Sequence, residues 1–214
     1  MKRLFLFLLA AIMMVGAVES VNAENKLLRK AQKKEYKNKM KQFKKEGWTL
    51  YGSSRSLDVV LLTHYDKLEA LGERGYELMG EAPKFQSNNV GKQTAINNAC
   101  NIYAREAGSY VKGRIVSDLA SNGVDASSEF DHFYAAYETA VGKEIKGELK
   151  ESFTIIRDNG DGTKTMQIYF IVDEDAATQA RIRAFENAKR ESEAAQKYAR
   201  EVSKFINEAP APAE

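Results

Sequence analysis

Residues 149–172, LKESFTIIRDNGDGTKTMQIYFIV, contain the clearest strand pattern of this 214-residue chain. Side chains alternate in character on both sides of residues 158–162, where two glycines, two aspartates and an asparagine are typical of a tight turn. The alternating positions are Leu149, Glu151, Phe153 and Ile155 before the turn and Met166, Ile168, Phe170 and Val172 after it. This pattern predicts a β-hairpin.

Outward from the hairpin, caps, breakers and helical periodicity predict the remaining elements. Small side chains such as Ala95 and Ala99 indicate that the longest central helix packs closely on a sheet. The predicted elements are a short strand or docking segment at 48–51, a helix at 57–71 capped by Ser56, a strand at 75–82 that ends in a turn, a helix at 89–118, and a helix over about 130–141 begun by Asp125, Ser127 and Ser128.

Residues 176–208 are predicted to form one continuous final helix, which ends before the Ala-Pro tail at 209–214. At 1.5 Å per residue this helix would be roughly 48 Å long, longer than a small domain is wide. Its narrow seam of small side chains must be covered by another helix. In a monomer this is the N-terminal helix of the same chain, and in a dimer it is the same helix of a second copy. The monomer is favoured. The seam consists of Phe185, Ala188, Ser192, Ala195, Ala199, Val202 and Ile206.

Together these elements predict an α+β fold. A small, mainly antiparallel sheet has a long helix packed across it, and N- and C-terminal helical arms flank it. The expected divisions are a signal peptide at 1–23, a lysine-rich amphipathic helix at 24–46, the α+β domain at 47–175, the long helix at 176–208 and the tail at 209–214.

The N-terminus has the three regions of a secretory signal peptide. Lys2 and Arg3 precede an apolar run at 4–18, and Val21-Asn22-Ala23 forms a cleavage site before Glu24. The apolar run is shorter than the ~20 residues that span a bilayer, so cleavage is favoured over a membrane anchor. We therefore expect a periplasmic or secreted protein with no transmembrane span after cleavage.

Residues 24–46 carry ten basic and three acidic side chains, whereas the formal net charge of the whole chain is only +2. Two interpretations remain open: a solvated charged face beside a net negative remainder, or attachment to an anionic envelope surface or to envelope proteins. Lysine predominates over arginine, which does not indicate bidentate phosphate recognition, and nucleic acid is not an expected partner. The contact residues expected are Lys33, Lys34, Lys37, Lys41, Lys44 and Lys45.

Few residues of this chain are suited to chemistry. One cysteine and two histidines exclude a disulfide scaffold and a cysteine-rich centre, and Cys100 is expected to be a buried, unpaired thiol. His64 is expected at the edge of the core, with a catalytic base as the alternative. Acidic residues at 158–161 and 173–175 are better explained by a turn and a helix N-terminus than by metal binding. No catalytic residue, metal ligand or cofactor is predicted.

Residues 76–81, followed by 95–99 and 102–106, resemble the strand and alanine-rich helix of the Lpp-twenty-like bacterial envelope lipoproteins. That domain is also similar to the N-terminal domain of a flagellar-assembly protein. In the family, a strand carrying a glycine precedes the helix, and further strands with a glycine turn follow. The resemblance implies an envelope location and no catalytic residues. This chain differs from the family in having Glu24, and not the lipidated cysteine, after the cleavage site.

These observations favour an exported, non-enzymatic cell-envelope protein that acts through contacts with proteins or with the envelope surface. The alternative, from another functional class, is a periplasmic hydrolase or small-ligand-binding enzyme whose site forms only in three dimensions. Clustered carboxylates in a deep pocket would favour the enzyme, and a flat surface with an exposed helical seam would favour the contact protein.

Overall fold

The computed structural model describes residues 30–119 and 130–208. The chain divides into two compact units, Met1–Glu46 and Gly47–Glu214. In the first unit, residues 30–46 are helical. Predictions about the signal peptide, the caps at 125–128 and the Ala-Pro tail concern residues outside the described parts.

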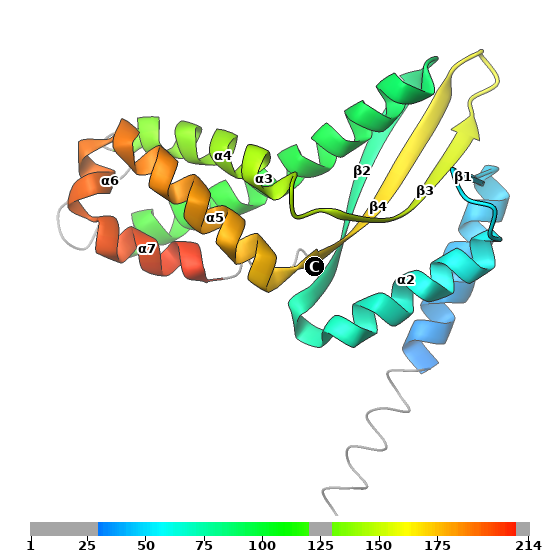
Figure 1. Ribbon diagram of the computed structural model, residues 1–214, viewed down its shortest axis with the longest axis horizontal. Helices are drawn as coiled ribbons and strands as arrows, with labels where there is room; N and C mark the ends of the chain where they lie inside the picture. The colour runs from blue at the N-terminus through cyan, green and yellow to red at the C-terminus, as the bar shows by residue number, and fades with distance from the viewer. Residues whose placement is uncertain (1–29, 120–129, 209–214) are drawn as a thin grey trace, which may run out of the picture. The chain divides into compact units, whose positions relative to one another are not determined.

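Within the described residues, the second unit contains a four-stranded antiparallel sheet in the order β1-β3-β4-β2. Its strands are β1 (Thr49–Tyr51), β2 (Gly75–Phe85), β3 (Lys150–Asp158) and β4 (Lys164–Asp173). The hairpin predicted at 149–172 is confirmed as β3 and β4. Asp158 and Asp161 accept hydrogen bonds from the backbone N–H groups of Gly160 and Thr163 in its turn. The α+β fold is therefore correctly predicted, and helices flank the sheet (Figure 1).

Helix α3 (Asn88–Leu119) packs on the sheet through small side chains. Ala95 and Ala99 are fully buried, as the sequence predicts. A close approach occurs at Gly80 of β2, where a Cβ atom would overlap the carbonyl oxygen of Ala95 and lie 2.9 Å from the Cβ of Ala99. Only glycine leaves room for the α3 backbone at this position.

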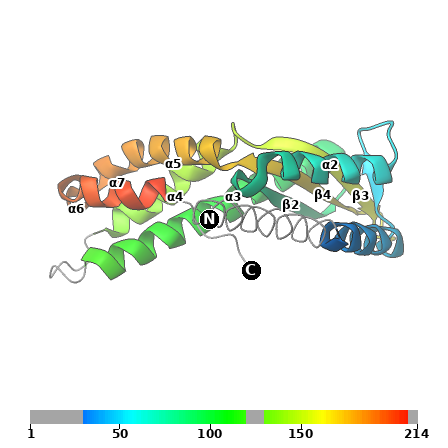
Figure 2. The same cartoon turned by 90° about the horizontal axis from the view of Figure 1, so that it is seen from below.

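Helix α2 (Leu57–Leu71) covers the opposite face of the sheet (Figure 2). Ser56 caps it by accepting a hydrogen bond from the backbone N–H of Val59, as predicted. Adjacent residues of a strand point to opposite faces, so Leu78 of β2 belongs to the α3 side, whereas Glu77 bonds to α2. The sheet therefore separates two packed compartments.

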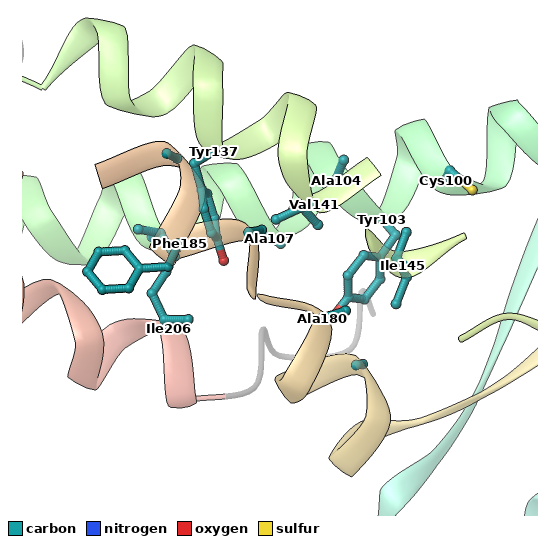
Figure 3. Close-up of a cluster of buried hydrophobic side chains, with 14 of the residues drawn as sticks. Cys100, Tyr103, Ala104, Ala107, Tyr137, Val141, Ile145, Ala180, Phe185 and Ile206 are labelled. Carbon is teal, nitrogen blue, oxygen red and sulfur yellow. The ribbon is translucent and has the colours of Figure 1, made fainter. Parts of the chain in front are cut away.

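The main core continues from the α3 face of the sheet into a group of helices at the far end of α3 (Figures 1 and 3). These are α4 (Asp131–Ile145), α5 (Glu174–Ala188), α6 (Glu193–Lys197) and α7 (Ala199–Asn207). Tyr103, Tyr137 and Ile145 are almost fully buried there. Cys100 is buried and unpaired in this core, as predicted.

The single final helix predicted at 176–208 is wrong. The segment breaks into α5, a 3-10 turn at Lys189–Glu191, α6 and α7. Ser192 adopts an extended conformation and its hydroxyl caps α6 by accepting from the backbone N–H of Ala195. The chain folds back, so α7 packs on α3 and α5. The seam residues Ala188, Ala195, Val202 and Ile206 are therefore buried by other parts of the same unit.

Arg181 of α5 holds this returning helix. Only 1% of its side chain is exposed, and its guanidinium donates to the carbonyl of Ile206 at 3.1 Å and to the hydroxyl of Tyr103 at 2.6 Å. Glu174 neutralises the charge at 2.5 Å. A buried cation needs both a counter-ion and hydrogen-bond acceptors, and Arg181 has both. Since these partners lie on α3, on α5 and at the end of α7, the contacts tie the three helices together.

Strand β2 is longer than predicted. The expected turn after residue 82 is instead an irregularity in the pairing with β4 between Ala82 and Phe85, with Lys84 at a φ of 51°. Since β2 is an edge strand, Pro83 removes no hydrogen bond that a central strand would need.

Candidate functional site

The predicted contact residues lie on the helix at 30–46. Each of them is exposed. At 3.6 residues per turn they fall within an arc of about 120°, next to an arc that carries the buried side chains of Met40 and Phe43. We call this arc the lysine face; it consists of Lys33, Lys34, Lys37, Lys41, Lys44 and Lys45. Within the described parts of the chain, these ammonium groups make no ion pair.

A second, unpredicted cluster surrounds His64 of α2. The side chain is fully buried, so the expectation of a position at the edge of the core understates its burial. Its Nδ1 lies 2.9 Å from the Oγ of Ser152, and its Nε2 lies 2.7 Å from a carboxylate oxygen of Glu77. Rings of Phe153 and Tyr169 contact the imidazole edge-on, with centroids 5.3 and 6.4 Å away. The ring is thus held in an apolar setting by two polar partners.

Ser152 owes its position to a β-bulge. Glu151 pairs with Phe170 and Phe153 pairs with Tyr169, which leaves Ser152 as the extra residue of β3. A bulge turns one side chain out of the regular alternation, and such irregularities occur often beside active sites. The uniform alternation predicted from Leu149 to Ile155 is therefore wrong at this point. Ser152 points to the α2 side, whereas Glu151 pairs with Lys92 of α3 at 2.9 Å.

Glu77 fixes the hydrogen-bonding roles of the imidazole. An ionised carboxylate only accepts hydrogen bonds, so the Nε2 atom facing it carries the proton. In the neutral ring Nδ1 is then an acceptor, and the hydroxyl of Ser152 donates to it. The three side chains form a directed chain from serine hydroxyl to imidazole to carboxylate.

A cavity of about 300 Å³ opens beside Ser152, where β1 stops pairing with β3 at Tyr51. Its wall is formed by β1, the loop after it, one side of α2 and the bulged part of β3. The wall carries two basic residues, one acidic residue and several hydroxyl groups: Arg55, Lys67, Glu151, Ser53, Thr63, Ser152 and Thr154. Of the three hydrogen-bonded residues Ser152, His64 and Glu77, only Ser152 lines this cavity.

Other candidates from the sequence do not converge. His132, the second of the two histidines, is exposed on α4. Burial raises the pKa of the Cys100 thiol, which reduces its reactivity. Asp173 caps α5 by accepting from the backbone N–H of Asp175, as predicted for acids at a helix N-terminus. No cluster of three potential metal ligands occurs among the described residues.

Ser152 and Glu77 were missed as partners of His64 because they lie 88 and 13 positions away and carry no local motif. Only the bulge and the way in which α2 crosses the sheet bring them together.

Among the helices that the structure describes, none is long and apolar enough to cross a bilayer.

Comparisons with protein-family models, curated proteins and solved structures find no match for this chain. The resemblance to the Lpp-twenty-like envelope lipoproteins therefore stays a prediction from the sequence pattern.

Proposed function

We propose that this protein is exported and is held on an anionic surface of the cell envelope by its lysine face. The observation that supports the proposal is the exposure of six lysines on one side of a helix without ionic partners among the described residues. Ammonium groups without an ionic partner among these residues can attract an external anionic surface.

The composition of the lysine face indicates the type of attraction. Lysine is a point charge without the planar fork of arginine, so it suits a dense anionic surface better than one shaped ligand. Each lysine near an anionic lipid surface contributes about 1 kcal/mol at physiological salt. Met40 and Phe43 are buried, so attachment relies on charge and not on insertion of these side chains.

Vesicle binding tests the proposal. The mature chain, beginning at Glu24, should co-sediment with vesicles containing anionic lipid and not with neutral vesicles. Binding should weaken steeply between about 0.02 M and about 0.3 M salt, because the screening length falls over this range. Lys37→Gln, Lys41→Gln and Lys44→Gln together should remove about 3 kcal/mol, or roughly 100-fold in affinity.

A matched control removes the same charge elsewhere. Lys143, Lys150 and Lys204 are exposed in the second unit and make no ion pair within the described residues. Their triple substitution by glutamine should change binding far less. Equal losses for both triple variants, or binding that ignores salt, would contradict the proposal. Intact-mass analysis of the exported protein checks export separately: a retained Met1 or a lipid adduct would contradict it.

A further inference from the structure

We propose that Ser152 is the nucleophile of a hydrolytic site that cleaves small esters whose acyl group is negatively charged, with His64 as its general base. Glu77 is the positioning residue that orients the imidazole. This inference is independent of the lysine face, and it would reverse the sequence-based expectation that the chain is not an enzyme.

The geometry meets the first requirement of such a site. A nucleophile and its base lie within about 2.6–3.2 Å, and a third group orients the base. Here the two distances are 2.9 Å from Ser152 to His64 and 2.7 Å from His64 to Glu77. The tautomer required of the base follows from the carboxylate of Glu77. This carboxylate holds the proton on Nε2, which leaves Nδ1 as the acceptor that faces the serine.

Exposure distinguishes this cluster from a purely structural buried histidine. His64 is fully buried and Glu77 is 27% exposed, whereas Ser152 is half-buried and lines the cavity. Ser152 is the hydrogen-bonding partner of the buried base that lies on the cavity wall. A purely structural tie would have no need for a bulge that places the serine on the cavity wall.

The reaction can be written with these groups and water. The hydroxyl proton of Ser152 passes to Nδ1 of His64 as Oγ bonds to the ester carbonyl carbon. The bond from that carbon to the alkoxy oxygen breaks, and the leaving alcohol takes the proton from Nδ1. Water then gives a proton to Nδ1, bonds to the acyl carbon and releases Oγ, which recovers the proton. Glu77 stays ionised and stabilises each transient imidazolium.

The surroundings of the imidazole favour this role. Phe153 and Tyr169 exclude water from the ring, and electrostatic interactions strengthen where water is absent. The contact between Glu77 and the imidazolium is therefore stronger than it would be at the surface.

The cavity wall indicates the substrate class. Arg55 and Lys67 make no ion pair within the described residues, whereas Glu151, the acidic residue of the same wall, is bound by Lys92 and by the hydroxyl of Thr154. The wall is therefore net basic. A volume of about 300 Å³ is at the lower end for ligand sites, so it suits a short acyl group with one carboxylate.

A fluorophosphonate probe tests the nucleophile in the folded protein. It should add one phosphonyl group to Ser152, found by peptide mass analysis, and denatured protein should not react. Ser152→Ala should abolish labelling. Ser53→Ala is the matched control, because Ser53 lines the same cavity without a bond to His64. Absence of labelling at Ser152, or equal labelling of Ser53, would overturn the proposal.

Steady-state kinetics tests the other roles. 4-Nitrophenyl hydrogen succinate should be cleaved at least roughly tenfold faster than 4-nitrophenyl acetate, and Arg55→Gln with Lys67→Gln should abolish that preference. Glu77→Gln reverses the tautomer, so kcat should fall by roughly 10³-fold with KM unchanged. Circular dichroism should show that the variant stays folded. Turnover that survives Ser152→Ala, or a folded Glu77→Gln with unaltered kcat, would overturn the assignment.

Discussion

Gly80 allows a decisive test of how helix α3 is seated on the sheet. In Gly80→Ala the new Cβ would overlap the carbonyl oxygen of Ala95 and lie 2.9 Å from the Cβ of Ala99. Ordinary carbon contacts are about 3.5–4.0 Å, and a backbone carbonyl cannot rotate away, so α3 must shift off the strand. Overpacking costs about 1–3 kcal/mol, and this rigid neighbour places the cost near the upper end, at about 3 kcal/mol.

Gly113→Ala provides the matched control. Gly113 lies within α3, and a Cβ there meets nothing within 4 Å. Both substitutions restrict the unfolded chain equally, but alanine in a helix interior gains about 1 kcal/mol over glycine. The control should therefore be slightly stabilised, which leaves the steric overlap as the difference between the two variants.

Urea unfolding followed by circular dichroism measures both variants. Gly80→Ala should lower the free energy of unfolding by about 3 kcal/mol, which corresponds to a fall in melting temperature of roughly 6–12 °C for a chain of this size. A free energy within about 0.5 kcal/mol of the unsubstituted protein would show that α3 does not approach β2 this closely, and the reasoning would fail.

Two further predictions concern the helical core. Ala195→Glu should lower the free energy of unfolding by about 3 kcal/mol because the site is fully buried, and sedimentation should show an unchanged mass; dissociation of a dimer would contradict the intramolecular burial of the seam. Burial raises the pKa of Tyr134 to about 12 and also raises the pKa values of Tyr76, Tyr103 and Tyr137 above 10. Because these folded pKa values exceed the unfolded ones, the stability contributed by the four neutral tyrosines is complete below pH 10 and falls as the pH rises above 10, through about 12 in the case of Tyr134. Urea unfolding, with tyrosine ionisation followed by absorbance, should therefore give a lower free energy of unfolding at pH 11 than at pH 9. Equal free energies at the two pH values would contradict the prediction.

The parts of the fold that the sequence predicts are those encoded by local periodicity. The hairpin, α2 with its Ser56 cap, and the small-residue face of α3 each depend on neighbours within a few positions. The final helix was mispredicted because its apolar period continues through Ser192, and only the extended backbone there reveals the break. An N-cap and a mid-helix serine look alike in a sequence without a breaker.

The candidate site shows the same limit more strongly. The exposed lysines could be named from the sequence because a charge excess in one segment is a local property. The hydrogen-bonded series from Ser152 through His64 to Glu77 could not be named from the sequence. Its members lie on three elements, and its geometry depends on one extra residue in β3. A single-residue bulge leaves no mark in an alternating pattern of polar and apolar side chains.

The sheet order also has a consequence for biosynthesis. Both outer strands, β1 and β2, are made before the central hairpin to which they pair, and Thr49 of β1 lies opposite Ile156. At about 5–20 residues per second, a ribosome needs roughly 5–20 s to extend the chain from β1 to β3. Until then no native sheet pairing is possible, and the contact order of the finished sheet is high. The nascent chain therefore carries both outer strands unpaired throughout this interval.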